Sequence, residues 1–191
     1  MGLTDGRLVW IAGSTHEGEE DVLLRVHKEL RGRYEDLLLI LAPRRPGRAR
    51  DLMDLCERMG LRFSIRSTGG SVRDRAVFIL DTLGELGRFY AVADVAFIGG
   101  SWVPLGGHNP LEAAAQGKPA CWGPHLFNFR EMESALLEMG CFGVVSTEEK
   151  LRRFLEAYLA SPDARREASR RAGDFLKAHR GAAGRLVRRL V

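Results

Sequence analysis

Short apolar runs alternate with amphipathic segments along most of this 191-residue chain. The clearest run, residues 37–42 (LLLILA), contains no polar residue and therefore predicts a strand that is covered on both faces. Similar short runs occupy residues 7–12, 62–66, 77–80, 95–98, 119–122 and 142–145. Strands that alternate with helices at this spacing predict an α/β fold, a doubly wound parallel sheet of about six strands.

The segments between these runs have the apolar periodicity of helices. Thr15 precedes an acid-rich turn, which predicts a helix from there to about Gly32. Further helices are predicted at 47–59, 84–93, 108–116 and 129–139, and the chain reads as helical from residue 148 onward. Helical spacing of Ala183, Leu186, Val187 and Leu190 predicts that the last helix packs against other parts of the protein. We expect one domain over 1–191, with 148–191 as its helical segment.

The composition is that of a folded globular protein, with 45% hydrophobic and 28% charged residues. The amino-terminal residues do not resemble a signal peptide, and no run approaches the roughly 18 apolar residues of a membrane span. Cys56, Cys121 and Cys141 are odd in number, widely spaced and set among apolar residues. That pattern favours buried free thiols and a cytoplasmic location.

The formal net charge of +4 is concentrated at the carboxyl end, where residues 152–191 hold 11 Lys/Arg against 4 Asp/Glu. Such a segment is either the solvated face of helices or a surface that binds nucleic acid or anionic membranes. We favour the solvated face, because the basic residues are not interleaved with aromatic residues as in RNA-binding motifs. Nucleic acid is therefore not an expected partner.

The segment from Gly99 to Asn128 carries the strongest signal for a binding site. Gly106 and Gly107 allow close approach of the backbone to a ligand, and a proline is well tolerated in the first turn of the helix that follows. The N–H groups at this helix start are predicted to face a phosphate. Glu112, about one turn further along the helix, is suitably placed for a ribose diol.

Arg44 follows the strand-ending Pro43 and is our choice for neutralising the phosphate, with Arg45 as its competitor. Each of these features also has an ordinary structural explanation. Two glycines form turns, Asn109 is a suitable helix cap, and an acid such as Glu112 is stabilised in a first helical turn. Their occurrence together favours a nucleotide site.

Several other chemistries are excluded by spacing. No His-x-x-x-His or Cys-x-x-Cys pair is present, so we expect no metal site. Ser14 lacks the Gly-x-Ser-x-Gly context of a hydrolase nucleophile, and the turn at Gly13 is neither a P-loop nor a dinucleotide-binding turn. Kinase, NTPase and dehydrogenase functions are therefore not expected, and we expect no cofactor.

Several motifs resemble the C-terminal half of the 3-deoxy-D-manno-octulosonic acid (Kdo) transferases. In chain order they are GSTHEGEE at 13–20, APR at 42–44, DTLGEL at 81–86, ADVAFIGGS at 93–101, GGHNPLE at 106–112, GPH at 123–125 with Asn128-Phe129, and RGA at 180–182. The resemblance covers nearly the whole chain. It departs from the family at Ala113, where many relatives have proline, and the loops that hold Trp102 and Trp122 vary among relatives.

The resemblance implies the Rossmann-like C-terminal domain of a GT-B glycosyltransferase, which binds CMP-Kdo or CMP. It further implies an acceptor domain outside this chain, which binds the lipid A precursor and supplies a catalytic glutamate. The chain alone is then expected to be inactive, its own catalytic residues are unknown, and the full enzyme is expected at the cytoplasmic face of the inner membrane. The open alternatives are half of another GT-B enzyme that uses UDP- or GDP-sugars, and a basic binding module.

We expect the substrate to contact residues in the turns at the carboxyl ends of the strands. They are Ser14, Thr15, His16, Arg44, Leu80, Asp81, Thr82, Leu83, Gly106, Gly107, His108, Asn109, Glu112, His125 and Asn128. Six of them are assigned to the phosphate and the sugar carboxylate, namely Ser14, Thr15, Arg44, Gly107, His108 and Asn109. Glu112 is assigned to the ribose, and the backbone at 80–83 to the base.

Overall fold

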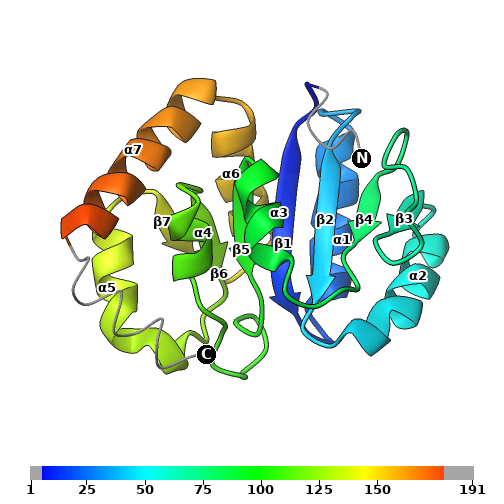
Figure 1. Cartoon of the computed structure of the whole chain (residues 1–191), viewed down its shortest axis with the longest axis horizontal. Helices are drawn as coiled ribbons and strands as arrows, with labels where there is room; N and C mark the ends of the chain where they lie inside the picture. Colours follow the sequence, from blue (N-terminus) through cyan, green and yellow to red (C-terminus); the bar gives the residue numbers. More distant parts are fainter. Residues whose placement is uncertain (1–5, 179–191) are drawn as a thin grey trace.

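The computed structural model describes residues 6–178, which form a seven-stranded sheet flanked by helices (Figure 1). The strands are β1 (Val9–Thr15), β2 (Leu38–Pro43), β3 (Phe63–Ile65), β4 (Val77–Ile79), β5 (Val95–Ile98), β6 (Ala120–Trp122) and β7 (Phe142–Val144). All pairings are parallel, in the order β3-β4-β2-β1-β5-β6-β7. The doubly wound α/β prediction is confirmed, with seven strands rather than about six.

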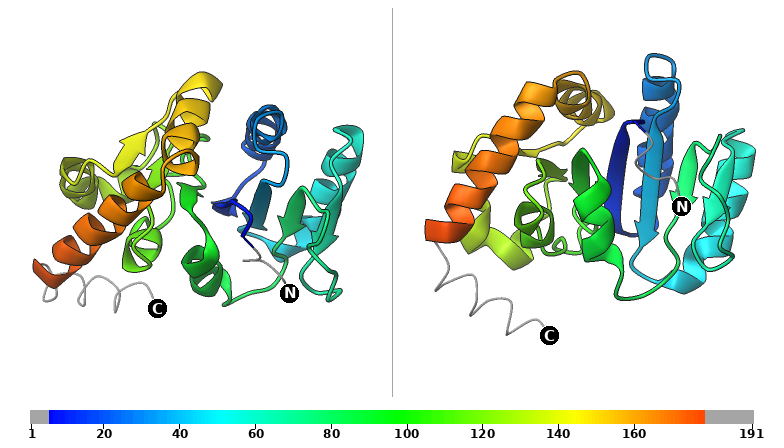
Figure 2. Two further views of the ribbon diagram at one scale, coloured as in Figure 1. Left: turned by 90° about the horizontal axis from the view of Figure 1, so that it is seen from above. Right: turned by 45° about the horizontal axis from the view of Figure 1, so that its top comes forward.

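Helices cover both faces of the sheet (Figure 2). They are α1 (Glu20–Arg31), α2 (Ala49–Arg58), α3 (Leu86–Val92), α4 (Leu111–Ala115), α5 (Arg130–Glu138), α6 (Glu148–Leu159) and α7 (Pro162–Ala178), with short 3-10 turns η1 (Pro46–Arg48) and η2 (Phe127–Phe129). The buried residues of α1, α2 and α6 pack on one face, and those of α3, α4, α5 and α7 on the other.

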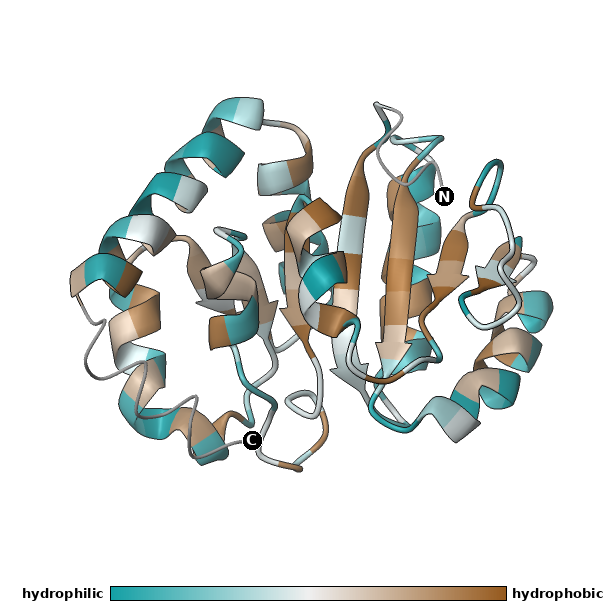
Figure 3. Cartoon of the chain, in the orientation of Figure 1, coloured by the Kyte–Doolittle hydropathy of each residue, from teal (hydrophilic) through white to brown (hydrophobic). Residues whose placement is uncertain are grey.

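The alternation of side chains along β1 explains why the core has two halves. Val9 and Ile11 belong to the cluster beneath α3 and α4, whereas Trp10 and Ala12 belong to the cluster beneath α1. Strands that are apolar on both faces require helices on both faces, and Figure 3 shows the hydrophobic strands enclosed by helices of mixed character. The three cysteines are buried free thiols, as predicted.

The central strand β1 lies between β2 and β5, so the chain winds outward in one direction from β1 and then in the other. This arrangement creates a topological switch point, where the loops after β1 and β5 diverge at the carboxyl edge of the sheet. That edge lies at the arrowheads of β1 and β2 in Figure 1. For a fold of this kind we expect the ligand crevice beside residues 16–19 and 99–110.

Two predicted boundaries near this crevice are wrong. The predicted Gly13–Thr15 turn is the end of β1, and α1 begins at Glu20 rather than directly after Thr15. The helix predicted from about His108 begins only at Leu111. The reason is that the N–H of His108 donates to the Gly99 carbonyl at 3.1 Å, which holds this residue in the loop.

In the described part of the basic carboxyl-terminal segment, several arginine charges are paired with nearby acidic side chains. Arg166, Arg170 and Arg171 on α7 form ion pairs with acids on the same helix, and Arg165 pairs with Asp94. This part of the segment is thus a solvated helix face. The predicted packing of residues 183–190 lies outside the described residues, and none of the helices described is long and apolar enough to span a bilayer.

Candidate functional site

Two histidines from opposite sides of the switch point meet above its glycine turn. His16 follows β1 and His108 follows β5, and their Nε2 atoms lie 2.8 Å apart. Their rings are parallel within 1°, with centroids 5.1 Å apart. At this separation one ring donates the hydrogen bond and the other accepts it, so at least one of the two imidazoles must be neutral while the bond exists.

Both imidazoles are held in their neutral form near pH 7. Burial, together with the electrostatic effects of His16 and Arg44, lowers the pKa of His108 to about 4. Burial also lowers the pKa of His16, together with Arg45, Arg44 and Arg48, while Glu19 opposes the shift. The pair therefore offers uncharged hydrogen-bonding groups beside a cluster of arginines.

Arg44 provides a positive charge that affects His16, His108 and Glu112. It follows β2, and its backbone N–H donates to the Thr15 carbonyl at 2.9 Å, which fixes where its side chain emerges. The side chain is exposed and forms no hydrogen bond or ion pair with any other residue of 6–178. Its charge lowers the pKa of both His108 and Glu112, so the guanidinium lies near both. Among these three groups, the charge of Arg45 lowers the pKa of His16 only.

Glu112 lies in the first turn of α4, on the same side of the cluster as Arg44. Partial desolvation by the surrounding protein raises the pKa of its carboxyl, and the Arg44 charge opposes that shift. The side chain is exposed and makes no hydrogen bond to another described residue. Its oxygens therefore remain available to accept hydrogen bonds from a ligand.

The glycine turn after β5 is occupied by a side chain of the protein itself. Glu19 is fully buried, and its carboxylate accepts hydrogen bonds from the N–H groups of Gly100 (2.8 Å), Ser101 (3.0 Å) and Trp102 (2.9 Å). It also accepts from the His16 N–H at 3.0 Å. Successive backbone N–H groups form an anion-binding concavity, and here the anion is Glu19.

The predicted phosphate seat at the start of α4 differs from the structure. The N–H groups of Gly107 and His108 donate to the carbonyls of Gly100 and Gly99, at 2.7 and 3.1 Å. The Leu111 N–H donates to the Asn109 side chain at 3.0 Å, so Asn109 acts as a local cap. The N–H groups of residues 107, 108 and 111 are therefore bonded within the loop, so these three do not form the predicted phosphate seat.

Of the two predicted contacts at the end of β1, Thr15 is engaged within the protein. The Thr15 side chain is buried, and its hydroxyl donates to Glu20 at 3.0 Å. Glu20 also accepts from Arg48 at 2.8 Å. This leaves no Thr15 hydroxyl facing the crevice, contrary to expectation. Ser14 is half-buried in the β1 bulge with a φ of 56°, a conformation that costs energy outside glycine and is typical of functional turns.

The loop after β6 closes the far side of the crevice. The Asn128 amide donates to the carbonyls of Leu105 (3.3 Å) and Gly107 (3.4 Å), so it holds the glycine loop in place. The His125 N–H donates to the Ser101 carbonyl at 2.9 Å, and its half-buried ring makes no hydrogen bond to a described residue. Gly106 is buried against Asn128, where a Cβ would overlap the amide.

The segment 80–83 forms a separate wall of the same edge. Leu80 is buried, and its N–H continues the ladder to Leu41. Asp81 accepts from the Ser67 hydroxyl at 2.6 Å, and Thr82 donates to Glu85. Of the four side chains, that of Leu83 projects furthest into solvent, with 74% exposed. This wall therefore offers backbone and apolar surface rather than uncommitted polar side chains.

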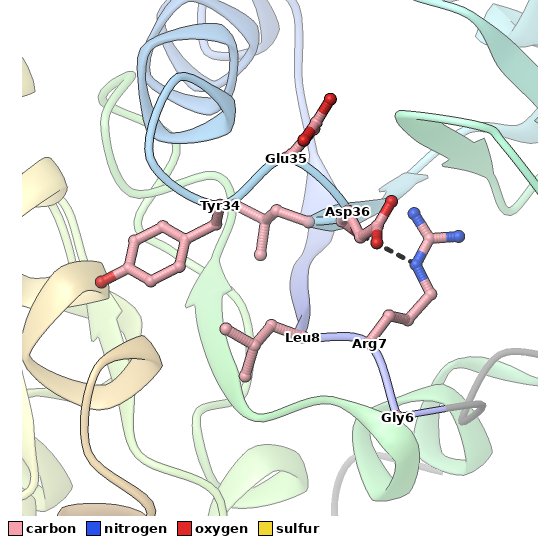
Figure 4. A pocket seen from close by; sticks show the side chains of 7 residues that line it. Gly6, Arg7, Leu8, Tyr34, Glu35 and Asp36 are labelled. Atoms are coloured by element: carbon pink, nitrogen blue, oxygen red, sulfur yellow. Dashed lines mark hydrogen bonds between the residues drawn. The ribbon is translucent and has the colours of Figure 1, made fainter.

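A hollow at the opposite end of the sheet is a weaker candidate (Figure 4). It lies between residues 6–8 and 34–37, before β1 and β2 begin. The Arg7 guanidinium there donates to the carbonyls of Asp36, Val72 and Arg75, at 2.8–2.9 Å. Since its cation is committed to the backbone and parallel sheets bind ligands at their carboxyl ends, we place the site at the switch point.

The predicted substrate contacts do not include the residues that hold the loops of the site together, namely Glu19, Glu20, Arg48 and Ser101. Glu19 and Glu20 were interpreted as acids that stabilise a helix start. One sequence signal was available, because consecutive glycine and serine residues after a buried strand leave several N–H groups in need of an acceptor. The sequence does not indicate that the acceptor lies 81 residues earlier.

Comparison with known proteins agrees with the motifs. No protein-family model matches the chain. The 3-deoxy-D-manno-octulosonic acid transferase of Haemophilus influenzae is 41% identical over 95% of this chain, and that of Bordetella pertussis is 34% identical over 95%. The chain spans 43% and 44% of the lengths of these two relatives.

The fold agrees as well. The structure of the C-terminal CMP-Kdo binding domain of WaaA from Acinetobacter baumannii superimposes with a TM-score of 0.85 at 30% identity. The alignment covers 91% of this chain and 91% of that domain. Identity and coverage of this order show the family to which the chain belongs. The chain belongs to the Kdo transferase family and has the C-terminal, GT-B Rossmann-like domain of those glycosyltransferases.

Proposed function

We propose that this domain binds CMP-Kdo, or CMP, at the switch point between β1 and β5. The observation that carries the proposal is the uncommitted Arg44 guanidinium beside the His16–His108 pair and Glu112. One arginine and two neutral imidazoles suit the single phosphate of a nucleoside monophosphate better than a diphosphate. The name of the Acinetobacter domain, which describes CMP-Kdo binding, supports the same ligand.

Each part of the ligand has a proposed partner. The phosphate and the sugar carboxylate lie against Arg44 and the two histidines, with the half-buried Ser14 and Asn109 as further partners. Glu112 accepts hydrogen bonds from the ribose diol, which an exposed carboxylate without protein partners can do. The backbone of 80–83 and the exposed Leu83 side chain receive the cytosine.

In the complete enzyme this domain supplies the donor for transfer of Kdo to a lipid A precursor in lipopolysaccharide biosynthesis. The acceptor and the catalytic base belong to an amino-terminal domain outside this chain, as the resemblance to the Kdo transferases implies. The enzyme works at the cytoplasmic face of the inner membrane as a peripheral protein. The isolated chain therefore binds the donor without catalysing transfer.

Isothermal titration of the chain with CMP, UMP and GMP tests the proposal. We expect CMP to bind at least tenfold more tightly than UMP and GMP. Arg44→Ala should abolish most of this binding, whereas the neighbouring Arg45→Ala, also exposed, is the matched control and should retain it. Preference for UMP or GMP would indicate another GT-B donor, and equal loss in both arginine variants would contradict the role of Arg44.

A further inference from the structure

We propose that Glu19 is the positioning residue of the donor site, which sets the distance between the loops that hold the nucleotide. This inference rests on the proposed function. Glu19 does not face the crevice itself, since its side chain is fully buried behind the glycine turn. It acts through the backbone of both loops at the switch point, because the carboxylate accepts from the His16 N–H in one loop and from the Gly100 N–H in the other.

The first part of the argument is the number of bonds that this carboxylate makes. It accepts four backbone N–H groups, one from His16 in the loop after β1 and three from residues 100–102 in the loop after β5. All four distances lie between 2.8 and 3.0 Å. Hydrogen bonds to an ionised acceptor are about twice as strong as neutral ones, so this joint is stiff.

The second part is what the joint controls. Gly100 lies directly beneath the histidine pair, where a Cβ would come within 3.0 Å of His108 Cδ2 and 3.5 Å of His16 Cδ2. Glu19 binds the N–H of Gly100 and the N–H of His16. The same carboxylate thus fixes the position of Gly100, which lies beneath the pair, and of His16, which is one of its two members. A shift of either loop would break the 2.8 Å contact between the imidazoles.

The third part is a relay to the loop after β6. Ser101 is fully buried and donates its hydroxyl to the Ile98 carbonyl at 2.5 Å. The same oxygen accepts from the Gly123 N–H at 2.8 Å, and the Ser101 carbonyl accepts from the His125 N–H. Because Glu19 holds Ser101 by its N–H, three loops of the donor site share one anchor.

The main test compares Glu19→Gln with Glu17→Gln. Glu17 is exposed in the same loop and makes no hydrogen bond to another described residue, so it is the matched control for charge. An amide at position 19 would turn an NH2 group toward N–H donors. We expect CMP affinity to fall at least tenfold in Glu19→Gln and to stay within twofold of the parent in Glu17→Gln. Equal affinity of the two variants would overturn the inference.

A spectroscopic readout separates positioning from general stabilisation. In Glu19→Gln the imidazole pair should loosen, so the NMR titration midpoint of His108 should rise from about 4 toward the ordinary range. A residue that merely stabilised the fold would leave that midpoint unchanged in the folded fraction. This experiment needs no nucleotide, so it tests Glu19 even if the parent chain fails to bind CMP, a result that would contradict only the proposed function.

Ser101→Ala covers the case in which Glu19→Gln does not fold. That variant keeps the Ser101 N–H bond to Glu19 but releases the Gly123 N–H from the relay. We expect a several-fold loss of CMP affinity, with chemical-shift changes at 123–125. Unchanged CMP affinity in Ser101→Ala would overturn the relay, and with it the claim that three loops share one anchor.

Discussion

The Nε2 atoms of His16 and His108 lie 2.8 Å apart, although 92 residues separate them in the chain. The parallel order of β1 and β5 brings their carboxyl ends together, and the glycine turn beneath lets the rings stack. A hydrogen bond between two imidazoles uses one proton, so protonation of the acceptor ring would break it. The position of the two rings therefore depends on their protonation state.

His108 is predicted to stay neutral well below pH 6. Burial is the main cause of its lowered pKa of about 4, with His16 and Arg44 as secondary causes. An NMR titration of the ring signals should show a midpoint near 4. In His16→Gln the midpoint should rise modestly, because one positive neighbour is lost while burial remains. A midpoint near 6.5 in the parent chain would contradict the pairing.

Glu112→Ala should weaken CMP binding by about 1–3 kcal/mol, the usual loss for hydrogen bonds to a charged group. The melting temperature should hardly change, because the exposed carboxylate has no hydrogen-bond partner in the described chain. Gln116→Ala, at the exposed end of the same helix, is the control for titration calorimetry. If both variants bind CMP like the parent, Glu112 does not contact the ribose.

Gly99→Ala should destabilise the protein by about 3 kcal/mol or more, the upper range for overpacking. A Cβ there would overlap the Ser14 carbonyl and crowd the Thr15 Cα, and backbone atoms cannot turn away. Gly87→Ala, in α3 with no atom within 4 Å of the new Cβ, should instead be stabilising by about 0.5–1 kcal/mol. Urea unfolding of both variants measures the contrast, and a mild effect at Gly99 would argue against close contact of the loops.

Arg48→Ala should cost about 3 kcal/mol of unfolding free energy, the lower end for a broken buried pair, because Arg48 keeps 22% of its side chain exposed. Glu20 is only 2% exposed and would be left as a buried charge with Thr15 as its remaining side-chain partner. Adding Glu20→Gln should recover part of the loss. A double-mutant cycle measures the coupling, and purely additive costs would show that the two side chains do not interact.

Acid should destabilise the fold through His27. This fully buried ring accepts from Trp10 Nε1 at 3.0 Å and donates from Nε2 to the Ala76 carbonyl at 2.9 Å. Burial lowers its pKa to about 3, whereas the unfolded chain has the ordinary value near 6.5. Its contribution is therefore complete above pH 6.5 and decreases as the pH falls toward 3, by up to about 1.4 kcal/mol per pH unit.

Unfolding by urea at pH 7.5, 6 and 5 tests this dependence on pH. His27→Phe should be less stable at pH 7.5, since the Trp10 N–H loses its acceptor. Its stability should nevertheless fall less steeply on acidification, because no proton is taken up at this position on unfolding. Parallel pH profiles for the parent and the variant would contradict a buried neutral His27.

The sheet was predictable because its strands are short and apolar on both faces. Residues 37–42 and 95–98 could not lie at a surface, and the glycines and prolines between the runs marked the ends of elements. The start of α4 was harder to predict, because it depends on a hydrogen bond from the His108 N–H to the Gly99 carbonyl within the same loop. Local preference alone favoured a longer helix there.

The site was predictable in part. The chain positions of Arg44, His108 and Glu112 after buried strands placed them at one edge, and the structure brings them together with His16. The role of Glu19 was not predictable, since an acid at a helix start has an adequate local explanation. Only the parallel pairing of β1 with β5 shows that its carboxylate reaches the N–H groups of the glycine turn after β5.

Titration of 15N-labelled chain with CMP, followed by amide chemical shifts, is the most direct test of a donor site at the switch point. The largest changes should map to Arg44, His16, the segment 106–112 and the backbone of 80–83, and they should saturate with one equivalent of CMP. Shifts that cluster instead at Arg7 and Tyr34–Leu37, around the hollow at the opposite end of the sheet, or no shifts at all, would contradict this account.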